Sequence, residues 1–265
     1  MKAIKQNIKE LEDNIVELLN SPNDTFSMDT FHDLRVEIKQ LNALMDVIEF
    51  CSKDFKRKQT FKPFKEIFHQ AGIIREIQLE EEELNDHFSS KSEINYLQQL
   101  NEHLLSEKSI FFSLLDQKRM DKIKRKFEII EPNIDHITKK KATKYLDKKR
   151  KSIEKLLSKD VIQTKDLHKL RKRLKLYNYN TDYLFPEEKE ENNTDNDGLT
   201  NLLGEWHDRQ VMLNHLKKTL HSKAKDDKEI SQMTHLKSKI TAERNELLKK
   251  IEEAKLLSIF YKPQK

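Results

Sequence analysis

Apolar residues recur every three or four positions through most of the chain, separated by charged and polar residues. This spacing is typical of α-helices that bury one face and expose the other. The stretch 2–20 is an example, with apolar residues at Ile4, Ile8, Leu11, Ile15 and Leu18. The whole pattern predicts helices over residues 2–20, 29–51, 63–87, 92–130, 134–157, 164–184, 199–220 and 227–259.

Residues that start or break helices predict where these helices end. Asp29 is a candidate N-cap for the second helix, and the fourth is expected to bend near Ser106. The acidic run from Glu80 to Glu83 is expected on a solvated face. Residues 186–198 are acidic and nearly devoid of apolar groups, which predicts a mobile loop.

Composition favours an all-α fold. The 265 residues are 37% charged and include only three Gly and five Pro, which is typical of long helices joined by short turns. No apolar run reaches the roughly 18 residues of a membrane span, and the N-terminus has no apolar signal core. We therefore expect a cytoplasmic protein with no membrane partner. The single cysteine, Cys51, excludes an internal disulfide and a cysteine-based zinc site, and it is expected to pack in the core.

Positive charge is concentrated in one segment of the sequence. Residues 131–185 hold 16 Lys and Arg against 7 Asp and Glu, a net charge of +9. The rest of the chain holds 35 against 39, a net charge of −4. The difference indicates a localised anion site rather than a uniformly basic surface.

Two motifs occur twice in the same order. FHDLRVEIKQLN at residues 31–42 recurs as LHKLRKRLKLYN at 167–178, and AGIIREIQ at 71–78 recurs as LGEWHDRQ at 203–210. The copies lie 136 and 132 residues apart, which indicates an internal duplication. We therefore predict one domain over residues 1–265, with repeat one at 1–132 and repeat two at 133–265. Its architecture would be two four-helix bundles related by a pseudo-two-fold axis.

The first motif places polar and basic side chains along one narrow stripe of a helix. At 100° per residue, Arg35, Lys39 and Asn42 all lie within about 80° of His32. In the second copy the stripe consists of His168, Arg171, Lys175 and Asn178, with Lys172 and Tyr179 on its other shoulder. Approximate symmetry would bring the two stripes to a shared basic central groove or pore.

Clustered cations repel one another unless an anion joins them. Two cations ~4 Å apart repel by ~4 kcal/mol at an effective dielectric constant of about 20. A bound polyanion removes this repulsion and adds charge-assisted hydrogen bonds. Arg supplies a bidentate fork for phosphate oxygens, whereas Lys supplies a point charge. The duplicated stripe therefore predicts anion binding.

Further residues are candidates for the same site. Arg75 and His207 occupy the same place in the two copies, so both are predicted anion contacts. In the basic helix over 134–157, Lys148 and Lys149 lie near the apolar boundary and are predicted to face the groove. The other lysines of that helix are expected on a solvated face. The remaining histidines form no metal-binding motif, so neither a metal site nor a cofactor is predicted.

The other residues of the second motif have predicted structural roles. Gly72 and Gly204 are expected to permit a close helix approach or a turn. For Glu76 and Asp208 we expect the holding of an arginine or the capping of a helix. Trp206 is expected in the core or at an interface.

Together these motifs resemble the CHAD family, named for its histidine-containing α-helical domain. The signature H-x-L-R-V-x-x-[KR]-[KR]-L-[RN] is matched from His32 to Asn42, and L-G-x-x-R-D by residues 71–76. The later pattern L-H-x-L-R-x-x-x-K-x-x-x-Y is matched from Leu167 to Tyr179, and L-G-x-x-x-D by residues 203–208.

The resemblance implies a helical duplication whose basic central groove or pore binds inorganic polyphosphate. Members of the family accompany polyphosphate granules or lie beside a CYTH triphosphatase domain in the same chain. We expect no CYTH domain within these 265 residues, so the resemblance implies an association with granules. Three positions depart from the pattern, because Gln40, Asn42 and Asn178 stand where the family often has basic residues. These replacements lower the charge of the groove and are expected to weaken binding.

The leading interpretation is therefore a protein that binds inorganic polyphosphate and is not an enzyme. Nucleic-acid binding is a second interpretation, although aromatic residues interleaved for base stacking are scarce. A third is an interaction adaptor whose basic stripe mediates assembly. A phosphohydrolase is the weakest, because no metal-binding carboxylate set and no Gly-rich phosphate loop is visible.

Overall fold

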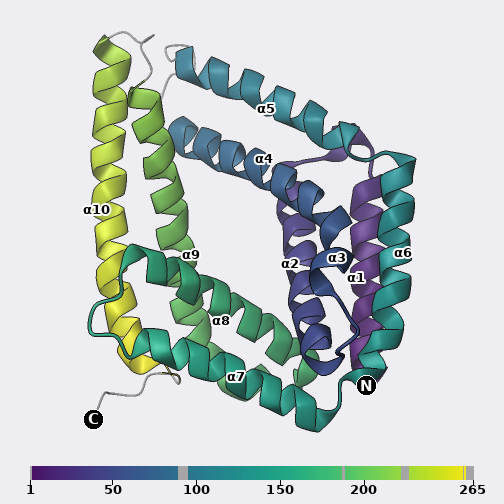
Figure 1. Ribbon diagram of the computed structural model, residues 1–265. Helices are drawn as coiled ribbons and strands as arrows, with labels where there is room; N and C mark the ends of the chain where they lie inside the picture. The colour runs from purple at the N-terminus through teal and green to yellow at the C-terminus, as the bar shows by residue number, and fades with distance from the viewer. Residues whose placement is uncertain (1, 89–94, 187–188, 222–226, 259, 261–265) are drawn as a thin grey trace. The chain divides into compact units, whose positions relative to one another are not determined.

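The computed structural model describes residues 2–88, 95–186, 189–221, 227–258 and 260, and within these residues the regular structure is helical, without a strand (Figure 1). The all-α prediction is therefore confirmed. In this described part, no helix combines the length and apolar character needed to cross a bilayer. The helices are α1 (Lys2–Asn20), η1 (Asn23–Thr25), α2 (Met28–Cys51), α3 (Arg57–Thr60), α4 (Lys62–His87), α5 (Asn95–Ser113), α6 (Gln117–Asn133), η3 (Ile134–His136), α7 (Lys139–Leu157), α8 (Thr164–Leu184), α9 (Lys189–Leu220) and α10 (Asp227–Leu257).

The chain forms two compact units, and neither is a continuous stretch of sequence. Unit 1 consists of Met1–Asp86, Tyr96–Leu146 and Tyr179–Pro186, and unit 2 of His87–Asn95, Asp147–Asn178 and Glu187–Lys265. Helices α7 and α8 each begin in one unit and end in the other. Each unit contains one copy of both repeated motifs, apart from Tyr179, which belongs to unit 1. The internal duplication itself stays a prediction.

In unit 1, α1 packs against both α2 and α6 (Figure 1). The apolar face of α2 is fully buried, with Phe31, Leu34, Ile38, Leu41, Met45 and Ile48 all 0% exposed. Phe26 and Phe31 join it to Phe111 of α5, with ring centroids 5.0–5.4 Å apart. In α1 the last buried residue is Leu19 rather than the predicted Leu18.

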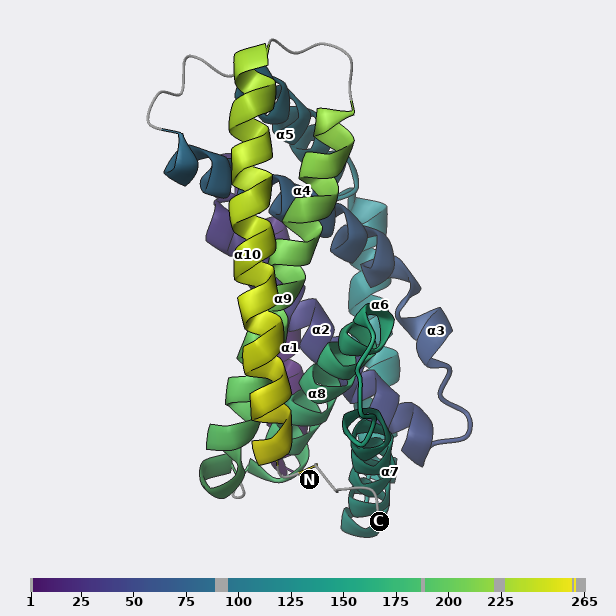
Figure 2. The ribbon, with the colours of Figure 1, turned by 90° about the vertical axis from the view of Figure 1, so that its left-hand side faces the viewer.

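Unit 2 is built around α9 and α10, which run side by side (Figure 2). Their apolar faces form one core with residues of α7 and α8, including Leu167, Leu170 and Leu174. Trp206 is 1% exposed and lies in this core, as predicted.

Besides Leu18 and the helix predicted over 134–157, which is η3 followed by α7 from Lys139, four further predictions about helices and solvation differ from the structure. The N-cap of α2 is Ser27, which accepts from the Thr30 amide at 3.2 Å, rather than Asp29. The predicted 92–130 helix is two helices separated at 114–116, where Asp116 caps α6, so there is a break in place of a bend near Ser106. Glu80 is buried and accepts a 2.6 Å hydrogen bond from Tyr96, so only part of the acidic run is solvated. The fourth difference concerns the loop predicted over 186–198.

The backbone from Lys189 onward is helical, as the first part of α9. The loop prediction is therefore wrong for 189–198, while residues 187–188 lie outside the described part. Asn, Asp, Thr and Gly dominate this segment and have low intrinsic helix propensity, so the support for its helix is the anchoring of the following turns in the unit 2 core by Leu199 and Leu203.

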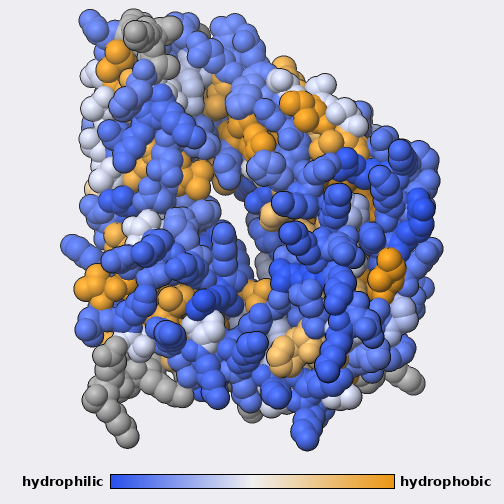
Figure 3. Space-filling view, in the orientation of Figure 1, coloured by the Kyte–Doolittle hydropathy of each residue, from blue (hydrophilic) through white to orange (hydrophobic). Residues whose placement is uncertain are grey.

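Polar residues cover most of the visible surface, and apolar residues are scattered between them (Figure 3). This distribution is expected for a chain with 37% charged residues. Cys51 is buried, and burial raises the pKa of its thiol, in agreement with the predicted packing role.

Candidate anion-binding site

The second motif brings basic groups of α8 and α9 together in unit 2. The His168 ring of α8 lies against two consecutive residues of α9, with centroids 4.9 Å from Trp206 and 5.0 Å from His207. Arg171, Lys172 and Lys175 follow His168 on α8. We call His168, Arg171, Lys172, Lys175 and His207 the unit 2 cluster.

The members of the unit 2 cluster act on one another electrostatically. Burial lowers the pKa of His207 to about 3, and the positive fields of Arg171, His168, Lys172 and Lys175 add to this effect. Burial also lowers the pKa of His168, with Lys172 and Arg171 contributing. The pKa of Lys175 is lowered by burial and then by Arg171, against the opposing field of Asp208. Burial and the neighbouring cations therefore destabilise the protonated, positively charged forms of His168, Lys175 and His207.

Buried nitrogens that find no hydrogen-bond partner in the described part of the chain include Nδ1 of His207, in the cluster, and Nε1 of its neighbour Trp206. The indole Nε1 can only donate, but Trp206 is 1% exposed, so this donor is enclosed in the core, where the sequence predicted the residue.

The first motif is arranged differently in unit 1. The Arg35 guanidinium lies over the Phe68 ring at 4.6 Å, and its Nη1 donates to the Phe68 carbonyl at 2.8 Å. A Cβ atom on Gly72 would lie 2.2 Å from that Nη1. Gly72 therefore leaves room for the Arg35 side chain beside α4, whereas the prediction was a close approach of two helices or a turn. Arg75 lies on the same face of α4 as Phe68 and Gly72, and its buried Nη1 has no hydrogen-bond partner among the residues that the structure describes.

The rest of the first stripe extends along α2. His32 is exposed, whereas Lys39 is half-buried. The Asn42 Oδ1 accepts from Arg57 Nε at 3.0 Å, and the Arg57 guanidinium also forms an ion pair with Asp46. Asn42 is therefore already engaged within unit 1.

The network around Asn42 continues into α7 and α8. Tyr145 of α7 donates to Asp46 at 2.6 Å and accepts from Asn180 of α8 at 2.8 Å. One turn later, the Tyr183 hydroxyl donates to Gln40 at 2.6 Å. Gln40 and Asn42, two departures from the family pattern, thus hold the end of α8 against α2.

The remaining predicted site residues are distributed over both units. Tyr179 is half-buried in the part of α8 that belongs to unit 1, so it is not grouped with His168. Lys148 is exposed and Lys149 half-buried on the part of α7 in unit 2. Asn178 donates to Thr200 at 3.5 Å, at the limit of a hydrogen bond.

Gly204 does not match its predicted role. It lies inside α9, and a Cβ atom there would meet no described residue within 4 Å, so it marks neither a turn nor a close approach. Beside Gly72, by contrast, the Arg35 guanidinium fills the corresponding space. Glu76 and Asp208 are exposed. Among the described residues, no group of three or more His, Cys, Asp or Glu could hold a metal ion.

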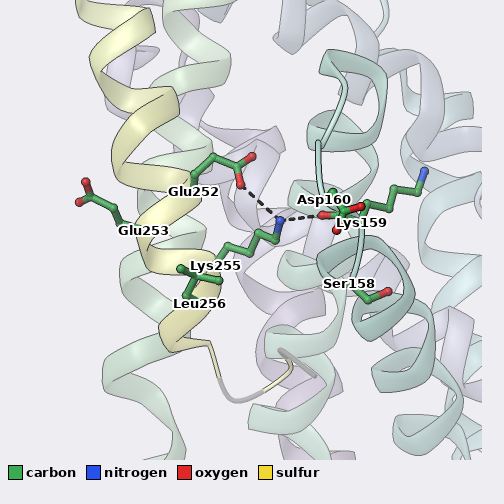
Figure 4. Close-up of a pocket in the computed structure, with 7 residues that line it drawn as sticks. All are labelled: Ser158, Lys159, Asp160, Glu252, Glu253, Lys255 and Leu256. Carbon is green, nitrogen blue, oxygen red and sulfur yellow. Dashed lines mark hydrogen bonds and ion pairs between the residues drawn. The ribbon is translucent and has the colours of Figure 1, made fainter. Parts of the chain in front are cut away.

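A cavity of about 390 Å³ in unit 2 is not part of this cluster (Figure 4). Its buried Lys255 donates to the Lys159 carbonyl at 2.7 Å and pairs with Glu252 at 3.3 Å. Lys255 thus holds α10 against the loop after α7. We assign this cavity a structural role.

Comparison with known proteins identifies the family. A scan against protein families matches residues 2–187 to the CHAD domain. The chain belongs to the CHAD domain family. The CHAD match includes both stripes, at His32 and His168, but ends before Gly204.

The fold agrees with this assignment. The crystal structure of the CHAD domain from the plant Ricinus communis matches with a TM-score of 0.71 and 10% sequence identity, covering 96% of this chain and 91% of that chain. At this identity the likeness shows the CHAD fold alone. No curated protein matches the sequence.

Proposed function

We propose that this CHAD domain binds inorganic polyphosphate without cleaving it. The polyphosphate would be either free in solution or part of granules. The observation that supports the proposal is the unit 2 cluster, in which burial and mutual repulsion lower the pKa values of His168, Lys175 and His207. A chain of phosphoryl groups would remove that repulsion along the whole stripe. Lys148 and Lys149 of unit 2 are proposed to add further contacts to this cluster, and Arg35, Lys39 and Arg75 are proposed to bind phosphoryl groups within unit 1.

The chemistry of the cluster suits phosphate more closely than nucleobases. Its aromatic neighbour Trp206 is 1% exposed and so offers no platform for base stacking. Binding would be dominated by charge, so affinity should fall steeply with salt. Nucleic acid is therefore the competitor in the test rather than the proposed ligand.

A titration of the full chain with long-chain polyphosphate at low and physiological salt tests the proposal. We expect saturable binding that weakens with salt, no release of orthophosphate, and little displacement by RNA of equal total charge. If folded protein fails to bind at low salt, the proposal is wrong. If RNA displaces polyphosphate at equal charge, the site is a nucleic-acid site.

A further inference from the structure

A second cation-rich groove lies in unit 1, away from both motifs in the sequence. It is a cavity of about 610 Å³ formed by the end of α3, the start of α4 and the exposed face of α6. Helices α3 and α6 are in contact, which closes one side. Six cations and two carboxylates line it: Lys62, Lys118, Arg119, Lys122, Arg125 and Lys126 against Glu66 and Asp116. The groove thus has a formal net charge of +4.

The two carboxylates are already bound within the groove. Asp116 caps α6 by accepting from the Arg119 amide at 2.6 Å, and Glu66 forms an ion pair with the Arg119 side chain at 2.6 Å. Arg119 lowers the pKa of the Glu66 carboxyl, and Lys62 and Lys122 lower it further. Cations from α4 and α6 therefore act at one point, which Glu66 only partly neutralises.

The cations extend along α6 over a distance that suits a chain rather than a single ion. Lys118, Lys122 and Arg125 are spaced by four and three residues, so they share one face. At 1.5 Å per residue they span about 10 Å. One phosphate ion could meet only part of this row, whereas several linked phosphoryl groups would meet all of it.

The lining also limits the kind of polyanion. No aromatic side chain lines the groove, so it offers no stacking platform for nucleobases. Cations surround it from α4 and from successive turns of α6, which favours a ligand that carries charge on all sides. A condensed phosphate has that property, because every phosphoryl group along it is ionised.

We propose that the groove between α4 and α6 is a second site for a linear condensed phosphate, separate from the unit 2 cluster. The identity of this ligand rests on the proposed function, whereas the existence of an anion site rests on the groove itself. Glu66 is a built-in competitor, since its carboxylate occupies part of the position that a phosphoryl group would take.

The test uses tripolyphosphate at low salt and the full chain, with Arg171→Gln/Lys175→Gln introduced to weaken the unit 2 cluster. In this background Lys122→Gln should weaken binding by about fivefold, and Glu66→Gln should strengthen it by about threefold. Lys124→Gln is the matched control, because Lys124 is exposed on the same helix about 200° from Lys122 and does not line the groove. It should leave affinity unchanged, and circular dichroism should show equal helix content in all variants.

The outcomes separate the two proposals. Equal tripolyphosphate affinity for Lys122→Gln and Lys124→Gln overturns the second site, whatever the unit 2 cluster does. Unchanged polyphosphate binding by Arg171→Gln/Lys175→Gln alone counts against the proposed function while leaving the groove testable. If hexaglutamate competes at the groove as well as tripolyphosphate does, the groove is an acidic-peptide site and the phosphate assignment is wrong.

Discussion

The two copies of the stripe have the same residues at the same spacing but different neighbours. In unit 1, Arg35 is fixed against α4 by the Phe68 carbonyl and the space left by Gly72. In unit 2, His168 meets His207, and burial together with nearby cations lowers their pKa values. Helical spacing decides which side chains share a stripe. The facing helix decides whether those side chains are hydrogen-bonded, as Arg35 is, or lie beside other cations that repel them, as His168 does.

The largest expected difference between the copies is in polyphosphate affinity. Arg171→Gln/Lys175→Gln should weaken binding by about a hundredfold, since two charge-assisted hydrogen bonds contribute roughly 1.5 kcal/mol each. Arg35→Gln/Lys39→Gln should weaken it by only about tenfold, because Arg35 already donates to the Phe68 carbonyl. Fluorescence anisotropy with labelled polyphosphate measures both. Equal losses in the two variants would mean that the copies contribute alike.

The two asparagines should differ in stability rather than in binding. Asn42→Ala removes the acceptor of the half-buried Arg57 Nε and should lower the free energy of unfolding by about 1–2 kcal/mol. Asn178→Ala removes a contact at 3.5 Å and should change it by less than about 0.5 kcal/mol. Urea denaturation compares them, and a larger loss for Asn178→Ala would contradict the distinction drawn here.

The two glycines should respond to alanine with opposite effects. Gly204→Ala meets no neighbour and replaces a helix-interior glycine, so it should stabilise the protein by about 0.5–1 kcal/mol. Gly72→Ala gains the same propensity but displaces the Arg35 guanidinium from Phe68, so the net change should be near zero or destabilising. Thermal unfolding of both variants provides the measurement. A stabilised Gly72→Ala protein would show that the Arg35 contact contributes little.

The smallest expected effect is that of pH. The pKa values of His168 and His207 lie below 6.5 in the folded chain, so the unfolded chain binds more protons below that pH and stability falls as pH drops through about 6.5. Under the proposed function, bound polyphosphate would raise both pKa values, so binding would take up protons. Affinity should therefore rise by about threefold from pH 7 to pH 6.

Substituting each histidine in turn identifies the residue whose protonation causes this pH dependence of affinity. His168→Gln should flatten the rise in affinity, whereas His32→Gln should leave most of it, because His32 is exposed. A pH profile that is unchanged by His168→Gln would exclude the unit 2 cluster as its source.

Local patterns in the sequence predicted the local features of the structure. The apolar period of α2 predicted its buried face, and the helical spacing of the second motif predicted that His168, Arg171 and Lys175 share one stripe of a helix, which is α8. Contacts between residues far apart in the sequence could not be predicted from these local patterns. No periodicity could indicate that Arg57 would bind Asn42, or that one glycine would face an arginine and the other open space.

Helices α7 and α8 each change unit partway along their length, and this has a practical consequence for fragments of the protein. A fragment cut at the end of the family match, residue 187, would keep all of unit 1 and the α8 half of the cluster, but not α9. Leu167, Leu170 and Leu174 would then lose Leu199, Leu203 and Trp206 as packing partners. Such a fragment would be prone to aggregate, and its failure to capture phosphate chains would say nothing about the intact protein.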